Sequence, residues 1–370
     1  MKVCLDIQSA IAQRAGVGRY TRLLVQHLGL ACGDDSLLLF YFDFRRQGVP
    51  FEAANTVPNP VRWCPGQLAQ AAWKTLGWPP FSFFSGPADL YHFPNFIIPP
   101  LNRGRTVVSI HDMSFFRFPQ FTEEKNRAWL SPRIRDTASR ADAILTISDF
   151  SAAEIHELLK VDRARIFTTY PGIGEEFSAP ASENVEATLA SLGIERPYLL
   201  TVGTLEPRKN IPFLVEVFEK LSDFDGVLVI AGMPGWKYEP ILERIRASSR
   251  SADIRYVRYV SDAQLPALYA GASLFVFPSF YEGFGFPPLE AMACGTPVLS
   301  SAGGSLPEAL GDGAVVLDSF NPDRWVASAR RLLSDSEYRR RQIEQGRRQA
   351  AKYTWTETAK KTWDVYRSVG

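Results

Sequence analysis

Short apolar runs alternate with amphipathic stretches along nearly the whole chain, and this alternation constrains the fold more than any other feature. The apolar runs are continuous rather than interleaved with polar residues, which is typical of strands that are buried on both faces. We therefore expect an α/β fold with parallel sheets that are covered by helices. A chain of 370 residues is too long for one ordinary core, so two domains are expected.

The expected elements form two groups, separated by a polar stretch near residues 172 to 196 that has the composition of a linker. In the first group, strands are expected at Val3–Ile7, Leu37–Phe42, Leu90–Phe93, Thr106–Ile110, Ala143–Ile147 and Arg165–Thr169, with helices at Gly18–Leu28, Glu124–Ser139 and Asp149–Leu159. In the second group, strands are expected at Tyr198–Val202, Val227–Ala231, Ile254–Tyr256, Leu274–Pro278, Pro297–Ser300 and Ala314–Leu317, with helices at Ile211–Leu221, Glu239–Ser248, Asp262–Gly271 and Pro288–Ala293. A last helix is expected from about Tyr353 to the end.

The segment TVGTLEPRKN follows the first strand of the second group, where ligands of open parallel sheets bind. Gly203 allows close approach of the backbone, and Arg208 and Lys209 offer positive charge for a phosphate. A solvated start of the next helix is the alternative. Against that alternative, basic residues at a helix N-terminus oppose the helix dipole unless an anion is present.

The segment FPSFYEGFGFPPLE places Glu282 and Glu290 on either side of a Gly/Phe/Pro loop. Free N–H groups of the first helical turn, together with this loop, are expected to form an anion cradle. Glu290 is expected in that first turn. The glutamates would then accept hydrogen bonds from hydroxyls of a ribose or a sugar, although Glu290 could also be an ordinary first-turn residue. A glycosidase-like pair of carboxylates is the rival interpretation, but no apolar surroundings are indicated that would raise either pKa.

Two further segments of the first group are candidates. GVGRY, which begins at Gly16, opens a helix and is a plausible anion loop, whereas Thr21 at the third glycine position argues against a nicotinamide dinucleotide site. His111 and Asp112 directly follow a strand, so they can orient a sugar hydroxyl or a leaving group. A structural histidine is the alternative for His111.

Six segments, in this order, resemble the retaining glycosyltransferases of family 4, and among them bacterial mannosyltransferases: GVGRY, SIHDMSF, TISDFSAAEI, TVGTLEPRKN, VIAGMPGW and FPSFYEGFGFPPLEAMACGTPVLSSAGGSLPE. The seven residues between Glu282 and Glu290 match the E-x7-E motif of that family. The resemblance implies the GT-B fold, in which two facing Rossmann-like, doubly wound domains border an interdomain cleft. The acceptor-side domain would span residues 1–175 with the helix 353–370 packed back on it, and the donor domain residues 196–352.

The resemblance also implies roles for individual residues. Glu282 would bind hydroxyls of the donor sugar, Glu290 the ribose, and His111 would lie beside the transferred sugar with Asp112 as its neighbour. Arg208 and Lys209 would hold the diphosphate. The remaining donor contacts are expected from Gly16, Val17, Gly203, Thr204, Gly232, Tyr259, Val260, Gly283, Phe284, Gly285 and Phe286. Many members of the family have Arg where Thr204 stands, so one phosphate contact would be missing or would pass to Arg208.

The expected reaction is transfer of mannose from GDP-mannose, with retained configuration, to a saccharide or a polyprenyl-linked saccharide in the synthesis of a surface polysaccharide. Transfer from a UDP-sugar is an alternative, and a non-catalytic nucleotide-sugar binding protein is another. The aromatic segment Trp63–Gly86 suggests a dock for a lipid-linked acceptor at a membrane surface, and packing of an irregular loop is its alternative.

Composition excludes several other classes. With 41 basic and 40 acidic side chains, the chain has no net field that would favour nucleic acid. The four cysteines are scattered, and no apolar run approaches the roughly 18 residues of a membrane span. A cytoplasmic protein is therefore expected, and peripheral contact at the inner face of the membrane is left open.

The DFD motif at Asp223 precedes a strand, so it lies at the amino edge of the sheet rather than at the edge where ligands bind. Neither an essential metal nor a cofactor is therefore expected. Loss of activity with a chelator, restored by magnesium or manganese, would contradict that expectation.

Overall fold

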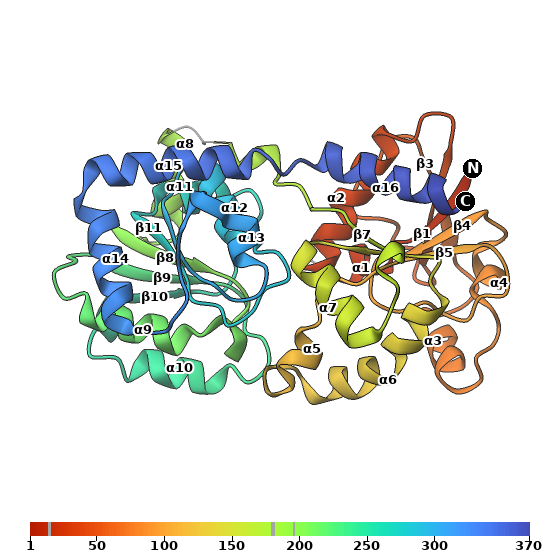
Figure 1. Ribbon diagram of the computed structural model, residues 1–370, viewed down its shortest axis with the longest axis horizontal. Helices are drawn as coiled ribbons and strands as arrows, with labels where there is room; N and C mark the ends of the chain where they lie inside the picture. Colours follow the sequence, from red (N-terminus) through yellow and green to blue (C-terminus); the bar gives the residue numbers. More distant parts are fainter. Residues whose placement is uncertain (14–15, 179–181, 195–196) are drawn as a thin grey trace. The chain divides into compact units, whose positions relative to one another are not determined.

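The computed structural model describes residues 1–13, 16–178, 182–194 and 197–370. They form two compact units (Figure 1). Unit 1 contains Met1–Arg117, Glu124–Gly172 and Thr354–Gly370, and unit 2 contains Phe118–Glu123 and Ile173–Tyr353.

Unit 1 is built on a seven-stranded parallel sheet with the order β3-β2-β1-β4-β5-β6-β7. Its strands are β1 (Lys2–Asp6), β2 (Ser36–Phe42), β3 (Thr56–Val61), β4 (Leu90–Phe93), β5 (Arg105–Ser109), β6 (Ala143–Thr146) and β7 (Ile166–Thr168). Every residue of β4 and β6 is buried, as expected for continuous apolar runs. Strand β1 pairs with both β2 and β4, so the direction of strand addition reverses between β1 and β4.

Helices cover both faces of this sheet. They are α1 (Gln8–Ala12), α2 (Val17–Leu30), α3 (Gly66–Thr75), α4 (Phe81–Ser85), α5 (Ser114–Arg117), α6 (Glu124–Arg140), α7 (Asp149–Leu159) and α16 (Trp355–Val369). Helix α16 packs on α2, where the Trp363 indole N–H donates to the Leu28 carbonyl at 3.0 Å. Ser148 caps α7 as expected, since its Oγ accepts from the Ser151 N–H at 3.1 Å.

Strand β3 was not expected, because its sequence TVPNPV contains two prolines. A proline has no N–H to donate to a sheet ladder, so it is tolerated in strands mainly at a sheet edge. Strand β3 is the outermost strand next to β2, which is the position that satisfies this restriction.

Unit 2 is built on a six-stranded parallel sheet with the order β10-β9-β8-β11-β12-β13. Its strands are β8 (Tyr198–Val202), β9 (Val227–Ala231), β10 (Ile254–Val257), β11 (Leu274–Phe277), β12 (Val298–Ser301) and β13 (Val315–Leu317). Its helices are α8 (Ser182–Ser191), α9 (Ile211–Lys220), α10 (Glu239–Arg246), α11 (Leu265–Gly271), α12 (Phe286–Ala293), α13 (Leu306–Leu310), α14 (Pro322–Ser334) and α15 (Ser336–Ala350). The long helices α14 and α15 were absent from the sequence-based expectation.

The division of the chain differs from the expected one in two places. The stretch interpreted as a linker contains α8, which packs on α11 and buries Val185 and Leu189, so it is part of unit 2. Phe118–Glu123 also groups with unit 2 rather than with the chain around it. There the Phe121 ring stacks on Phe280 at 5.1 Å, and its carbonyl accepts from the Trp236 indole. A ring stack and a hydrogen bond between residues so far apart leave no periodic pattern in a sequence.

Candidate active site

The candidate site of unit 2 lies where the direction of strand addition reverses. Strand β8 pairs with β9 on one side and with β11 on the other, so the reversal falls between β8 and β11. Ligands of open parallel sheets bind beyond the carboxyl ends of the strands at this point. The segments with Gly203–Lys209 and Ser279–Gly285 follow β8 and β11, so the fold brings together the two loops that the sequence singled out.

Direct hydrogen bonds join these two loops. The Phe280 N–H donates to the Arg208 carbonyl at 2.9 Å. In return, the Arg208 guanidinium donates to the Tyr281 carbonyl at 2.6 Å. Arg208 and Lys209 lie in the 3-10 turn η4 (Pro207–Lys209) that precedes α9. The basic residues are therefore held in a defined position rather than in a solvated helix start.

Four charged side chains, which we call the charge cluster, meet between the loops: Glu206, Arg208, Lys209 and Glu282. Arg208 reaches Glu282 at 2.7 Å and Glu206 at 2.6 Å, and Lys209 reaches Glu282 at 2.6 Å. The Lys209 ammonium also lies 4.9 Å from the centre of the Phe277 ring. Two positive charges thus lie beside two negative charges. The sequence indicated that basic residues at this helix N-terminus need an anion nearby, and the carboxylates of Glu206 and Glu282 are such anions.

Glu282 is 7 % exposed, yet it is held in its charged form. Burial of the carboxylate opposes ionisation, but the charges of Arg208 and Lys209 outweigh it and hold the pKa of Glu282 at about 2. Burial also lowers the pKa of Lys209 from its ordinary value, while Glu282 opposes that change. Each charge therefore depends on its partners, because burial without them favours the neutral forms.

This arrangement predicts a specific acid sensitivity. The pKa of Glu282 is 4.5 in the unfolded chain and about 2 in the folded chain. Ionisation of Glu282 therefore stabilises the folded chain, and this stabilisation is fully present above pH 4.5. That stabilisation is lost as the pH falls from about 4.5 towards 2, and it is on the order of 3 kcal/mol. Urea unfolding at pH 6 and pH 3 should show a steeper loss of unfolding free energy for the natural chain than for Glu282→Gln. Equal losses in the two proteins would contradict the prediction.

The backbone of Glu282 is held by the loop before α13. Its carbonyl accepts from the Ser305 N–H at 3.0 Å and from the Ser305 hydroxyl at 3.1 Å. Gly304 pairs with Glu282, and a Cβ on Gly304 would lie 2.3 Å from the Glu282 carbonyl, so only glycine fits there. The Ser279 hydroxyl donates to the Glu282 carboxylate.

Glu290 lies one turn further into its helix than predicted. Helix α12 begins at Phe286, with Gly285 as N-cap at φ 100°, so Glu290 is in the second turn. It is 3 % exposed, and its carboxylate accepts from the Tyr269 hydroxyl at 2.8 Å. An ordinary solvated first-turn position is therefore excluded, and the ribose role stays a prediction.

The predicted anion cradle has fewer donors than expected. Because α12 begins at Phe286, the next two positions of its first turn are Pro287 and Pro288, which have no N–H group. Only the backbone from Gly283 to Phe286 can donate at this end. Phe284 itself is buried against Tyr353, with ring centres 5.1 Å apart, and so anchors the loop.

The loops after β8 and β9 stack on each other at the same edge of the sheet. The Leu205 N–H donates to the Met233 carbonyl at 2.9 Å. A Cβ on Gly232 would lie 1.9 Å from the Gly203 carbonyl, which explains the glycine. Thr204 and Tyr259 are exposed, and Val260 is half-buried. The structure thus places these predicted donor contacts around one edge, while their roles stay predictions.

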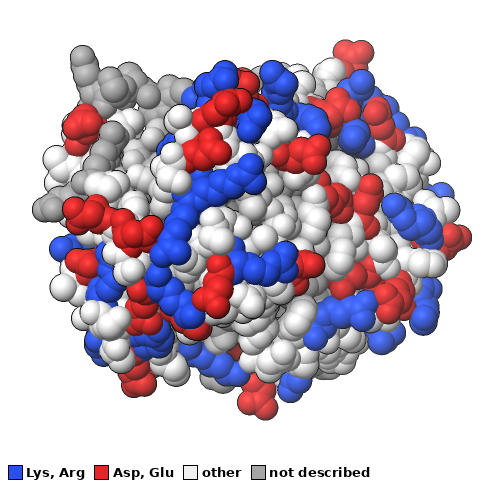
Figure 2. Space-filling model, turned by 60° about the vertical axis from the view of Figure 1, so that its left-hand side comes forward, with Lys and Arg blue, Asp and Glu red and all other residues white. Residues whose placement is uncertain are grey.

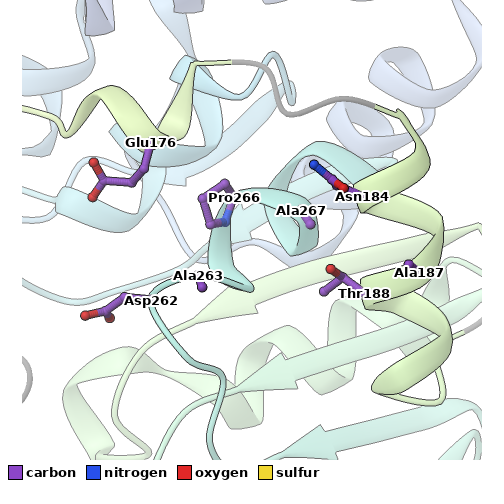
Figure 3. A pocket seen from close by; sticks show the side chains of 8 residues that line it. All are labelled: Glu176, Asn184, Ala187, Thr188, Asp262, Ala263, Pro266 and Ala267. Atoms are coloured by element: carbon purple, nitrogen blue, oxygen red, sulfur yellow. The ribbon is translucent and has the colours of Figure 1, made fainter.

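A hollow of about 340 Å³ opens between α8 and the start of α11 (Figure 3). Asn184 and Thr188 reach from α8 towards α11, and Glu176 and Asp262 line the hollow on the side away from α8. Carboxylates accept hydrogen bonds and repel phosphate, so this hollow suits a group with N–H or O–H donors. Asp262 lies two residues after Val260, one of the expected donor contacts.

In unit 1, His111 follows β5 and is buried among aromatic rings. Its Nε2 donates to the Pro94 carbonyl at 2.8 Å, so Nδ1 carries the lone pair. The rings of Tyr20 and Phe96 pack against the imidazole at 4.8 and 5.4 Å. Burial lowers the pKa of His111, which keeps the ring neutral at neutral pH. The ring can therefore accept a hydrogen bond from a hydroxyl but cannot supply positive charge to a phosphate.

Asp112 and the glycine loop complete the predicted residues of unit 1. The Asp112 carboxylate accepts from the Ser114 N–H at 2.9 Å, which is a local turn contact at the start of α5. Gly16 is the N-cap of α2 at φ 57°, and Val17 is its first residue, so their N–H groups lie at a helix N-terminus as predicted.

Comparisons with known proteins identify the family. Residues 15–177 match the model of "Glycosyltransferase Family 4", and residues 186–349 match "Glycosyl transferases group 1". The O-antigen chain mannosyltransferase B of Escherichia coli is 34% identical over 282 residues, which are 75% of this chain and 74% of that protein. The chain belongs to glycosyltransferase family 4. The predicted family and the predicted glycosyltransferase activity are thereby confirmed.

Further comparisons agree with this family. The serotype-specific mannosyltransferase WbdA of Escherichia coli is 32% identical over 298 residues, and the match spans 75% of this chain but only 35% of that larger protein. Sucrose-phosphate synthase from Thermosynechococcus elongatus has the same fold, with a TM-score of 0.79, 18% sequence identity and coverage of 100% of this chain and 99% of that one. The GT-B fold class that the resemblance implied is confirmed.

Sequence reasoning missed three residues of this family 4 site. Glu206 is a member of the charge cluster, the Ser279 hydroxyl donates to the Glu282 carboxylate, and Ser305 donates to the Glu282 carbonyl. All three lie inside the quoted segments TVGTLEPRKN, FPSFYEGFGF and SAGGSLPE, so proximity to the predicted residues was the available signal.

Basic and acidic side chains are intermixed on the face of this glycosyltransferase that Figure 2 shows. That face has no large field of one sign to attract a polyanion. Among the described residues, no group of three or more His, Cys, Asp or Glu side chains could hold a metal ion. Within the same part of the chain, no helix is both long and apolar enough to cross a membrane.

Proposed function

We propose that this glycosyltransferase moves mannose from GDP-mannose, with retention of configuration and without an essential metal, to a saccharide or lipid-linked saccharide of a surface polysaccharide. The observation that carries the proposal is the charge cluster at the strand reversal of unit 2, in a chain whose relative is an O-antigen mannosyltransferase. Breaking the glycosidic bond builds negative charge on the leaving diphosphate, and fixed cations stabilise that charge in the transition state.

The contacts support different roles for the two cations. Arg208 is engaged by Glu206, Glu282 and the Tyr281 carbonyl, so it orients the loop and the Glu282 carboxylate. Lys209 has three donors, of which one reaches Glu282. We therefore assign the principal diphosphate contact to Lys209 and the positioning role to Arg208. Within this proposal, Lys209 rather than Arg208 takes the phosphate contact that is missing where Thr204 stands.

The donor can be tested by the stabilisation that free nucleotides confer. A nucleotide that binds the folded chain raises its melting temperature according to its concentration and affinity. GDP should raise the melting temperature more than UDP, ADP or NAD at equal concentration. A larger rise with UDP would replace the proposed donor with a UDP-sugar. Slow hydrolysis of labelled GDP-mannose would show directly that this donor is cleaved.

An exposed group of aromatic rings in unit 1 supports contact with a membrane or a lipid-linked acceptor. Within Trp63–Gly86, the rings of Trp73, Phe81 and Phe84 pack inside, as the loop-packing alternative required. Trp63, Trp78 and Phe83 are instead 62, 64 and 58 % exposed, and the other two rings contact Phe83 at 5.7 and 6.4 Å. We call these three residues the aromatic surface. Tryptophan side chains of this kind favour the interface between lipid and water.

Removing part of the aromatic surface should weaken binding to vesicles. The double variant Trp78→Ser, Phe83→Ser should lower partitioning into vesicles with anionic lipid by at least about tenfold, because two large apolar side chains no longer enter the interface. Phe44→Ser is the matched control, since Phe44 is 53 % exposed in the same unit. Unchanged sedimentation of the double variant with vesicles would remove the membrane part of the proposal.

A further inference from the structure

Three neighbouring strands of unit 1 end side by side at one edge of its sheet. Strand β4 pairs with β1 on one side and with β5 on the other, and the direction of strand addition reverses between β1 and β4. Ligands of open parallel sheets bind beyond the carboxyl ends of the strands at such a reversal. His111 follows β5 at this edge, and its Nε2 donates to the carbonyl of Pro94, which directly follows β4. Asp6 is the last residue of β1, so it ends the strand on the other side of β4.

The turn between β1 and α1 holds the Asp6 carboxylate in place. Its Oδ1 accepts from the Gln8 N–H at 2.9 Å. The Gln8 side chain in turn accepts from the Phe42 N–H at the end of β2, at 3.0 Å. One oxygen of Asp6 is therefore bound to the backbone of a turn that is itself anchored on the neighbouring strand.

The half-buried Asp6 side chain carries its negative charge without a cation beside it. Among the residues that the structure describes, the Gln8 N–H is its one hydrogen-bond donor, and none forms an ion pair with it. Burial raises the pKa of Asp6 from 3.8 to about 6, and the Gln8 N–H opposes only part of that rise. At pH 7.5 the carboxylate is still ionised, so its charge lowers the stability of the folded chain. The amide of an asparagine would accept the same hydrogen bond without that cost, so the turn alone does not require a carboxylate.

Two other carboxylates at this edge of the sheet are engaged by side chains of unit 1. Asp43, which follows β2, pairs with Arg62 at 3.4 Å. Asp149, at the start of α7, accepts from the Thr168 hydroxyl at 2.6 Å. Asp6 differs from both, because its described neighbours offer it a single backbone N–H. Its accessible side is therefore available to a ligand.

We propose that Asp6 binds the acceptor: its carboxylate accepts a hydrogen bond from a hydroxyl of the acceptor saccharide, at the same sheet edge as His111. A carboxylate accepts from hydroxyls and repels phosphate, so Asp6 contacts the saccharide part of the acceptor rather than a phosphate group. Strands β1 and β5 are two strand spacings apart, about 10 Å, so one saccharide can reach both residues. This inference deepens the proposed function and rests on it, because it names a residue for the acceptor of that reaction.

The variant Asp6→Asn tests this role, since the amide oxygen still accepts from Gln8 and only the charge is lost. An octyl glycoside of mannobiose serves as the acceptor probe. KM for this probe should rise about tenfold, as for a lost hydrogen bond to a charged group, while KM for GDP-mannose stays unchanged. Hydrolysis of GDP-mannose without the probe should also keep its rate. The melting temperature at pH 7.5 should rise, because a half-buried charge without a cation has been removed.

Asp142→Asn is the matched control, because Asp142 is half-buried at the opposite edge of the same sheet. There it accepts from the Thr106 N–H and pairs with Arg105, both at 2.8 Å. This variant should lower the melting temperature and leave KM for the probe unchanged. An unchanged KM for the probe in Asp6→Asn, or an equal rise in Asp142→Asn, would refute the role of Asp6. A natural chain that leaves GDP-mannose intact would instead refute the proposed function itself, so the two failures are distinguishable.

Discussion

Lys209→Met should lower kcat for sugar transfer by about 100-fold or more, because the leaving diphosphate loses its principal fixed positive charge. Methionine keeps most of the length and apolar contact of lysine, including its place over the Phe277 ring. Glu282 keeps its ion pair with Arg208 at 2.7 Å, so the buried carboxylate is not left without a partner. The expected loss is therefore in the transition state rather than in folding.

The measurement is the steady-state rate of transfer, or of donor hydrolysis, together with the melting temperature. Lys220→Met is the matched control, because Lys220 lies on α9 in the same unit and pairs with the exposed Asp323 at 2.9 Å. That variant should keep its activity. If Lys209→Met transferred sugar at the natural rate while Arg208→Met did not, the division of roles between the two cations would be reversed.

The continuous apolar runs of the sequence predicted the two parallel sheets. Strands that are buried on both faces are apolar along their whole length, so they can be recognised from the sequence alone. Strand β3 escaped this reasoning, since its prolines disfavour the interior of a sheet and only its edge position makes them acceptable. Helix α8 was not predicted either, because the few apolar residues that pack on α11 lie in a largely polar sequence without a clear helical pattern.

The site was predictable in its location but not in its electrostatics. The position of TVGTLEPRKN directly after a strand of an expected open parallel sheet indicated where a ligand binds, and the observed strand order agrees with it. The ion pairs join residues more than 70 positions apart in sequence, at 2.6 and 2.7 Å, and no spacing rule foretells such a pairing. The sequence predicted an anion beside these basic residues but could not indicate that Glu282 and Glu206 lie there; their contact with a phosphate stays a prediction. The cluster is balanced before any donor arrives.

That balance changes what is expected of Glu282→Gln. If Glu282 only bound hydroxyls of the donor sugar, as the resemblance implies, its removal would reduce transfer and leave nucleotide binding largely intact. In the structure, Glu282 lies within 2.7 Å of both cations and partly neutralises the groups that would face a diphosphate. Glu282→Gln removes one negative charge, so GDP should bind more tightly, on the order of tenfold. Transfer should still fall about 100-fold, because the donor sugar loses a charged hydrogen-bond acceptor.

Calorimetric titration with GDP and an assay of transfer separate the two effects in Glu282→Gln. Glu219→Gln is the matched control, since Glu219 pairs with Arg244 at 2.6 Å in the same unit and hydrogen bonds to Arg244 hold its pKa at about 2 as well. It lies outside the charge cluster, so its loss should cost stability and leave both GDP affinity and transfer unchanged. Weaker GDP binding by Glu282→Gln would mean that the carboxylate orients Arg208 and Lys209 more than it neutralises them. In that case Glu282 would hold Arg208 and Lys209 in the orientation that binds GDP. Its negative charge would then not limit the affinity for GDP.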